Sequence, residues 1–215
     1  MVALGGQTIG QLGVKDHHAV ALLEPGEKEE ALGRDVALEP AQQRKGRVVG
    51  PDGQPVTGVT TRGLTSGGAE ETSKGAEFTV RGINPRAPRL ITFHHKGKNL
   101  GGFVKELPAE KDGPLIVKLQ PCGALSGRIV DQDGQPVAGF RGEFSVGYWG
   151  QYEFTTDKEG RFRVEGLVPG LKYSVWQGVK GGIVNIHPGT TLEPGKHKDL
   201  GDIKAANPGG LPGDS

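Results

Sequence analysis

The chain has 215 residues, of which 38 are glycine and 15 are proline, so about a quarter of its positions interrupt regular structure. This content excludes long uninterrupted helices, because a glycine inside a helix costs about 1 kcal/mol relative to alanine and a proline about 3 kcal/mol. The 26 basic and 25 acidic side chains leave a net charge of +1, which excludes the basic surface typical of nucleic-acid binding, and no apolar run reaches the roughly 18 residues that span a bilayer.

The first segment, residues 1–41, resembles the end of a repeat that lacks its beginning. Its sequence LEPG at 23–26, followed by LGRDV at 32–36, is similar to LEPG at 192–195, followed by LGDI at 200–203. We therefore expect closing strands of a preceding unit, and we expect the chain to be the C-terminal part of a larger protein. The first seven residues have neither the basic region nor the apolar region of a signal peptide.

The two segments that follow repeat each other. Residues 46–58 (GRVVGPDGQPVTG) recur 81 positions later as residues 127–139 (GRIVDQDGQPVAG). Residues 78–85 (FTVRGINP) recur as residues 162–169 (FRVEGLVP). Units of about 80 residues are the size of a compact domain rather than of a solenoid repeat. We predict complete units at 42–121 and 122–206, and a disordered tail at 207–215.

Short β-strands account for the pattern within each unit. Asp-Gly between β-branched runs indicates a tight hairpin, and the proline that follows belongs at a strand start or an edge, because it has no N–H to donate. Phe162 with Val164, and Tyr173 with Val175, alternate with a period of two, which places each pair on one buried face. Turn signals every 8 to 12 residues predict an all-β chain of tandem small antiparallel sandwiches, with about seven strands each.

These motifs resemble the carboxypeptidase regulatory-like domain, a family related to the CnaB-type and transthyretin-like (prealbumin-like) sandwiches. The resemblance covers about 165 residues as two copies, and its signature lies in turn and core positions. It implies a non-catalytic accessory sandwich with an immunoglobulin-like or carbohydrate-binding-like fold, often in tandem arrays on large bacterial proteins. It also favours an extracytoplasmic location.

Metal chemistry finds little support in the sequence. The His-Glu-x-x-His pattern is missing, and neighbouring histidines on a strand point to opposite faces. We interpret His94 as half-exposed packing and expect no metal site and no cofactor among the six histidines, which are His17, His18, His94, His95, His187 and His197. Asp131-Gln132-Asp133-Gly134 looks like the start of a calcium loop, but the first repeat has Gly50 and Pro51 at its first two positions, so we interpret it as an Asp-Gly turn.

Covalent chemistry is also weakly supported. Cys122 permits no internal disulfide, lies at the junction of the two units and has no candidate base beside it in the sequence. CnaB-like relatives can close an isopeptide bond from a lysine, yet Lys45 of the first unit is replaced by Ser126 in the second. We therefore expect no enzyme activity and no such bond.

One aromatic cluster is a candidate ligand-binding site. Nine of the twelve aromatic residues fall in the second unit, and Tyr148, Trp149 and Tyr152 surround a glycine at an expected hairpin tip. Exposed rings there would stack on a sugar or on an extended peptide. The alternative interpretation is structural, with Trp149 covering the end of the sandwich or packing between domains.

Three functions remain open at this stage. The leading hypothesis is a non-enzymatic scaffold, spacer or interaction segment of a larger bacterial protein. The second is a carbohydrate- or peptide-binding module that uses the aromatic cluster, with a glycan or another protein as its partner. The third, which comes from the family name, is an accessory regulatory domain of a peptidase whose catalytic domain lies elsewhere.

Overall fold

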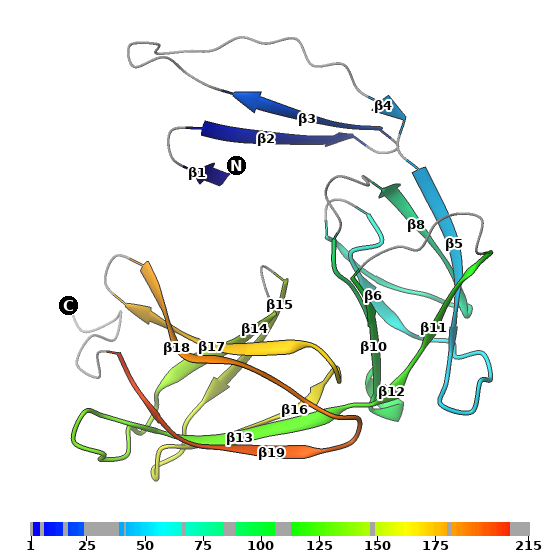
Figure 1. The fold of residues 1–215 in the computed structure, drawn as a ribbon. Helices are drawn as coiled ribbons and strands as arrows, with labels where there is room; N and C mark the ends of the chain where they lie inside the picture. Colours follow the sequence, from blue (N-terminus) through cyan, green and yellow to red (C-terminus); the bar gives the residue numbers. More distant parts are fainter. Residues whose placement is uncertain are drawn as a thin grey trace. The chain divides into compact units, whose positions relative to one another are not determined.

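The computed structural model describes residues 42–65, 68–83, 89–105, 113–146, 152–179 and 182–206 in full, together with the backbone of the strands at 2–4, 7–14, 17–23, 39–40 and 149–151. In these residues the regular structure is β-strand, apart from one 3-10 turn, η1 (Lys96–Lys98). The all-β fold class expected from the sequence is confirmed (Figure 1). None of the helices in the described part of the chain is long and apolar enough to cross a membrane.

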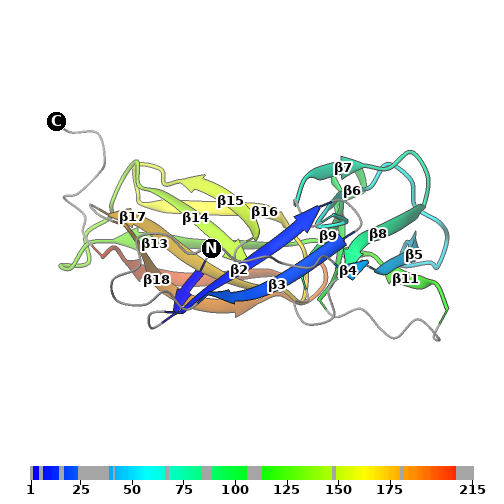
Figure 2. The same cartoon turned by 90° about the horizontal axis from the view of Figure 1, so that it is seen from above.

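The N-terminal strands form a sheet of their own in the order β1-β2-β3-β4, with antiparallel neighbours. Figure 2 shows the long hairpin of this sheet in blue. Its strands are β1 (Val2–Leu4), β2 (Gln7–Val14), β3 (His17–Leu23) and β4 (Glu39–Pro40). Its origin as the end of a preceding repeat stays a prediction.

The first repeat contributes two further sheets, in the orders β11-β5-β8 and β12-β10-β9-β6-β7. Buried side chains alternate along the strands; β8, for example, buries Phe78 and Val80 and exposes Arg81. The strands are β5 (Gln42–Val49), β6 (Thr60–Arg62), β7 (Glu70–Thr72), β8 (Glu77–Ile83), β9 (Ile91–His95), β10 (Leu100–Val104), β11 (Leu115–Lys118) and β12 (Gln120–Pro121).

The second repeat has seven strands in two sheets, in the orders β16-β13-β19 and β15-β14-β17-β18. The expected antiparallel pairing holds with one exception, because the first and last strands, β13 and β19, pair in parallel. The strands are β13 (Gly123–Val130), β14 (Arg141–Val146), β15 (Trp149–Thr155), β16 (Arg161–Leu167), β17 (Lys172–Val179), β18 (Gly182–Thr191) and β19 (His197–Lys204).

Aromatic rings fill the core of the second repeat. Phe154 stacks on Phe162 with ring centroids 4.3 Å apart, and Phe144 lies 5.8 Å from the same ring. Tyr173 is fully buried, and its hydroxyl donates to the carbonyl of Val168 at 2.9 Å. Burial of such large apolar side chains is the main source of stability in a small sandwich.

In each repeat, the first and second sequence motifs pair with each other on neighbouring strands. Gly46 on β5 is the Cα partner of Phe78 on β8, and Gly127 on β13 is the partner of Phe162 on β16. The register shifts at the same place in both pairs, next to Gly82 and Gly166, which have φ angles of 63° and 72°. Glycine adopts this left-handed conformation without strain, so the glycine of the second motif supplies a β-bulge in each repeat.

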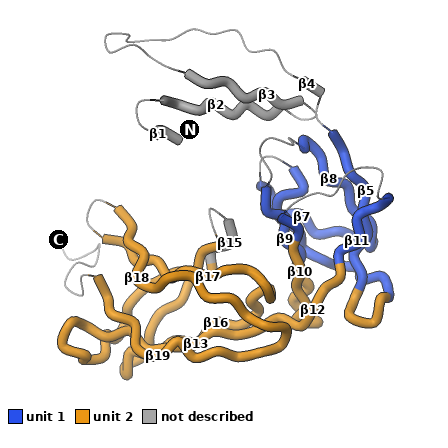
Figure 3. The backbone as a smooth tube through the Cα atoms, viewed as in Figure 1, with its two compact units in different colours: residues 1–49, 54–93, 104–117 blue, residues 50–53, 94–103, 118–215 orange. Residues whose placement is uncertain are grey.

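The chain divides into two compact units, coloured in Figure 3. The first contains residues 1–49, 54–93 and 104–117, and the second contains 50–53, 94–103 and 118–215. Residues 94–103, which include most of β10, are therefore grouped with the second repeat. The domain boundaries expected at 41/42 and 121/122 stay a prediction.

Candidate functional site

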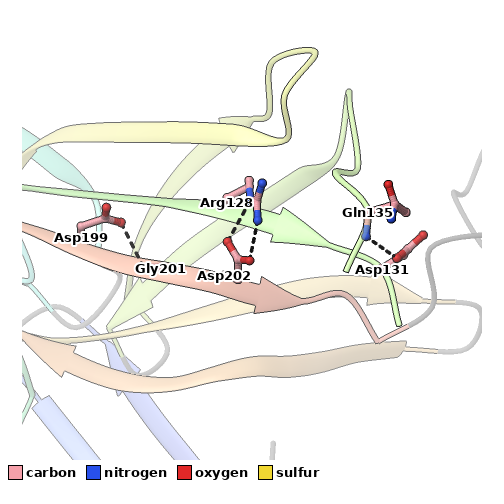
Figure 4. A network of polar contacts seen from close by, with 6 residues as sticks. All are labelled: Arg128, Asp131, Gln135, Asp199, Gly201 and Asp202. Atoms are coloured by element: carbon pink, nitrogen blue, oxygen red, sulfur yellow. Dashed lines mark hydrogen bonds and ion pairs between the residues drawn. The ribbon is translucent and has the colours of Figure 1, made fainter. Parts of the chain in front are cut away.

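The carboxylates of two aspartates accept hydrogen bonds from backbone N–H groups of the turns that they begin. Asp131 Oδ1 accepts from the backbone N–H group of Gln135 at 2.8 Å (Figure 4) and from that of Asp133 at 2.9 Å. Asp157 Oδ1 does the same for Glu159 and Arg161, at 3.0 and 2.7 Å. An aspartate that closes a turn in this way substitutes for a backbone acceptor. In the turn that follows Asp131, Gly134 of the Asp-Gly pair has a φ of 81°, and the equivalent Gly53 has a φ of 79°.

One ion pair joins the terminal strands of the second repeat. Arg128 on β13 and Asp202 on β19 are Cα partners, and the guanidinium donates to both carboxylate oxygens, at 2.8 and 2.6 Å (Figure 4). This hydrogen bonding lowers the pKa of Asp202 and raises the pKa of Arg128. Bidentate geometry fixes the position of both side chains, although the pair is exposed to solvent.

The histidines are engaged separately. His95 Nδ1 accepts from the backbone N–H of Lys98 and so caps η1, while His94 and His187 are half-buried. The side chains of His17 and His18 lie outside the described residues. In the part of the chain that the structure describes, no three histidine, cysteine, aspartate or glutamate side chains come together as metal ligands would.

The sequence analysis missed a contact between a serine and a histidine. His197 Nε2 lies 2.8 Å from Ser126 Oγ, which is the distance between a nucleophile and its general base. Catalysis also needs a group that orients the imidazole, and the nearby Asp199 Oδ1 instead accepts from the backbone N–H of Gly201 at 3.0 Å. The pair lies on the exposed surface of two neighbouring strands. We interpret it as a cross-strand hydrogen bond.

Cys122 is enclosed by packing. Its side chain is 4% exposed, and burial raises the pKa of the thiol to about 11. A Cβ on Gly101 would lie 2.9 Å from the sulfur and 2.9 Å from Val168 Cγ2. The neutral thiol therefore behaves as a small apolar side chain, because only the thiolate is nucleophilic.

Of the predicted aromatic cluster, only Tyr152 has a described side chain. Tyr148 lies outside them, and of Trp149 the structure describes only the backbone, whose Cα is the partner of Val146. Tyr152 is the partner of the buried Phe144, and its ring meets the ring of Tyr173 edge-on at 5.9 Å. Burial and the hydrogen bond with Tyr152 raise the pKa of Tyr173. Tyr152 thus packs toward the core, and the binding role of all three residues stays a proposal.

Another tryptophan lies on the outer face of the same sheet. Successive cross-strand partners form a row across its four strands, in the order Glu153, Glu143, Trp176 and Asn185. Partners in an antiparallel sheet share a face, and Trp176 faces away from the core because its neighbour Val175 is fully buried. The sequence offered a signal in the alternation of β17, where Trp176 falls on the face opposite Tyr173 and Val175.

This row, which we name the Trp176 row, has the composition of a small binding surface. Trp176 is half-buried, Glu143 is half-buried, and Glu153 and Asn185 are exposed. Gly178 follows Trp176 on the same face, and a Cβ there would meet nothing within 4 Å. An indole beside carboxylate and amide groups can combine stacking with directional hydrogen bonds.

The first repeat carries a groove of about 630 Å³ along β5 and β8. Charges of both signs line it, including Lys45, Arg47, Arg81, Glu71 and Glu77. Arg47 Nη2 lies 4.0 Å from Glu77 Oε1, so part of this charge is paired. Lys45 is exposed, whereas the lysine of an isopeptide bond is buried; its position is that of a surface side chain.

The geometry defines a chain of small β-sandwiches, and comparison with known proteins adds only distant likenesses. No family model matches the chain, and no curated protein matches it. A DUF3823 family protein from Parabacteroides merdae matches 40% of this chain and 46% of its own length, with 21% identity and a TM-score of 0.29. A streptococcal ancillary pilin matches over 91% of this chain and 71% of its own, with 15% identity and a TM-score of 0.31.

A third solved structure, GBS52, the minor pilin of Streptococcus agalactiae, matches over 80% of this chain and 98% of its own. The identity is 15% and the TM-score is 0.35. Because these TM-scores are below 0.5, the likenesses carry no argument about function. The functional conclusion therefore rests on the geometry of the chain itself.

Proposed function

We propose that this chain is a non-enzymatic, force-transmitting spacer built from tandem β-sandwiches, with units at 42–121 and 122–206. The observation that carries the proposal is the parallel pairing of β13 with β19, the first and last strands of the second repeat. Membership of the carboxypeptidase regulatory-like family, and the extracytoplasmic location that this resemblance favours, are part of the same proposal.

Parallel terminal strands resist a pull on the chain ends. When the chain is pulled at both ends, force acts on Gly123 at the start of β13 and on Lys204 at the end of β19. It therefore pulls these two hydrogen-bonded strands in opposite directions along their length. Every hydrogen bond between them is then loaded at once, whereas an antiparallel terminal hairpin would open one bond at a time. The Arg128–Asp202 pair adds a bidentate side-chain link across this interface.

Single-molecule force spectroscopy on the full chain, held by its two ends, tests this function. We expect two unfolding events of about 80 residues each, which release roughly 280 Å of extended chain per event. Arg128→Ala should lower the unfolding force of one event. Arg163→Ala is the matched control, because Arg163 pairs with Glu165 on its own strand at 2.8 Å and joins no strands. Unfolding without a resolved force peak would exclude the spacer function.

The Trp176 row favours a second function, the binding of a glycan or an extended peptide by the second repeat. Retention of the chain on immobilised glycans and cell-wall material, compared between the native sequence, Trp176→Ala and Trp149→Ala, distinguishes the two aromatic sites. Loss in Trp176→Ala alone would assign binding to the Trp176 row, and loss in Trp149→Ala alone would assign it to the predicted cluster. Equal retention in all three proteins would remove this function.

A further inference from the structure

The N-terminal half of β18 is the most exposed apolar strand in the described residues. Ile183 is 65% exposed and Val184 is 38% exposed, and only one other large hydrophobic side chain, Ile116, is comparably exposed there. Ile183 and Val184 are consecutive, so they point to opposite faces of the sheet. Burial of one face against the core therefore cannot cover both of them.

β18 is also the edge of its sheet. Among the described strands, the order β15-β14-β17-β18 leaves its second side without a hydrogen-bonded neighbour. Natural edge strands are protected by charges, prolines or bulges, which prevent another chain from adding a strand. In β18 the protection is limited to one half, where register shifts and Pro188 interrupt the ladder near His187.

The other half, residues 182–186, has little such protection, because only its last residue, Ile186, lies at a register shift. Its sequence GIVNI has no charge and no proline, and it contains three β-branched residues. Its pairing with β17 is regular, since Gly182, Ile183, Val184 and Asn185 follow one another opposite Val179, Gly178, Gln177 and Trp176. A regular, uncharged and apolar edge of this kind is a template for a further strand.

We propose that residues 182–186 pair with the same residues of a second copy of this chain, antiparallel about a two-fold axis at Val184. The interface is isologous, as in most homodimers. It joins two four-stranded sheets into one continuous sheet. This inference is independent of the proposed spacer and binding functions, because it concerns only an exposed backbone edge.

Symmetry and charge favour a second copy as the occupant. A two-fold axis perpendicular to the sheet places the outer faces of both copies on the same side of the joined sheet. Residues that pair must therefore lie on the same face, so both have odd numbers or both have even numbers. An axis at Val184 satisfies this rule: Val184 meets its own copy, and Ile183 lies opposite Asn185. The absence of charge from 182 to 191 means that identical strands do not repel each other.

The same register extends the Trp176 row. Asn185 is the partner of Trp176 within one copy, and in the dimer it would lie beside Ile183 of the other copy. Ile183 would then have a cross-strand neighbour on the outer face, and Val184 would have one on the inner face. The arrangement thus reduces the exposure of both apolar side chains to water.

Register-specific crosslinking of the full chain tests the proposal. In Val184→Cys, the two thiols would face each other at a Cα separation of about 5 Å, within disulfide range. In Ile183→Cys, the symmetry-related Cα atoms would be about 8 Å apart, beyond that range. Mild oxidation with diamide joins two thiols as one disulfide, and the diamide takes up the two electrons and two protons. We expect a crosslinked dimer for Val184→Cys and little for Ile183→Cys.

Sedimentation velocity at about 100 µM protein, a concentration suited to a weak interface, gives an independent measurement. The native chain and Ile116→Lys should sediment as dimers, while Val184→Lys should be a monomer with an unchanged circular dichroism spectrum. Ile116 is the control because it is exposed on another strand. A monomeric native chain, a dimer that survives Val184→Lys, or equal crosslinking of the two cysteine variants would each overturn the proposal.

Discussion

The phenyl ring of Phe78 occupies the space that a Cβ on Gly46 would need. These residues are Cα partners on β5 and β8, and that Cβ would also lie 2.6 Å from the carbonyl oxygen of Leu115. Gly127 and Phe162 repeat the relationship in the second repeat, where the added Cβ would lie 2.9 Å from Phe162 Cζ. The glycine of the first motif and the phenylalanine of the second therefore form one structural unit.

Substitution of Gly46 tests this relationship. We expect Gly46→Ala to lower the free energy of unfolding by about 1–3 kcal/mol, because the ring and the neighbouring backbone must both move. Gly178→Ala is the matched control: it lies on a strand, its Cβ would meet nothing within 4 Å, and its φ is not in the left-handed region. Urea unfolding of the two variants measures the difference. Equal stability of both variants would contradict the close packing.

Arg44 offers a prediction based on the repeat. It is 7% exposed; Nη2 donates to the carbonyl of Gly113 at 2.9 Å, and Nη1, also buried, makes no hydrogen bond in the structure described. The same register position in the second repeat is Leu125, which is fully buried. We expect Arg44→Leu to raise the free energy of unfolding by about 1 kcal/mol, since it removes an incompletely paired buried charge.

The control for this prediction is Arg44→Ala, which removes the charge but leaves a cavity and should destabilise the chain. Thermal unfolding of the two variants beside the native chain gives the comparison. Destabilisation by Arg44→Leu as large as that by Arg44→Ala would mean that the guanidinium itself is needed.

The reactivity of Cys122 follows from its burial. Because burial raises its pKa to about 11, the folded chain holds almost no thiolate at pH 8. We expect iodoacetamide to label Cys122 far more slowly in the native chain than in urea. The stabilisation from the neutral thiol is present below the ordinary thiol pKa of about 9 and is lost as the pH rises toward 11. Equal labelling rates in native and unfolded protein would contradict the burial.

Asp202 should titrate below its ordinary pKa of 3.8. The Arg128 hydrogen bond lowers this pKa, so its contribution to stability is present above pH 3.8 and is lost as the pH falls through the lower value. Carboxyl-detected NMR titration measures it directly. Arg128→Ala should return the pKa of Asp202 toward 3.8, while Arg163→Ala should leave it unchanged.

Ser126 should be chemically inert. Although His197 Nε2 lies 2.8 Å from its hydroxyl, we expect no labelling by a fluorophosphonate, because phosphonylation of the hydroxyl, with release of fluoride, also needs an oriented imidazole and an oxyanion site. Intact-mass analysis after incubation with the reagent checks this. An adduct on the native chain that is lost in Ser126→Ala would reveal hydrolase chemistry and would contradict the non-enzymatic proposal.

The sequence was informative about the fold because each repeated residue has a structural role within its own turn or strand pair. Gly134 adopts the positive φ of a turn, Gly166 supplies a bulge, and Phe162 packs on a glycine; each role depends on a residue type that is visible in the motif. Parallel pairing of β13 with β19 could not be predicted in this way, since it depends on contacts about 74 positions apart, such as that of Arg128 with Asp202.

The candidate site was harder to predict for a related reason. A cluster of aromatics along the chain draws attention to Tyr148, Trp149 and Tyr152, yet Tyr152 packs against the buried Tyr173. The Trp176 row is contributed by four different strands and has no contiguous signature. Cross-strand register, rather than proximity in sequence, determines which side chains share a surface.

The parallel β13–β19 pair also determines where the chain enters and leaves the second repeat. An eight-residue strand measures about 26 Å, and two parallel strands of this length place the entry at Gly123 and the exit at Lys204 at opposite ends of the sandwich. A unit of this kind adds its own length to any polypeptide in which it is inserted. The number of such units, and not their surface chemistry, would then determine the reach of the protein that contains them.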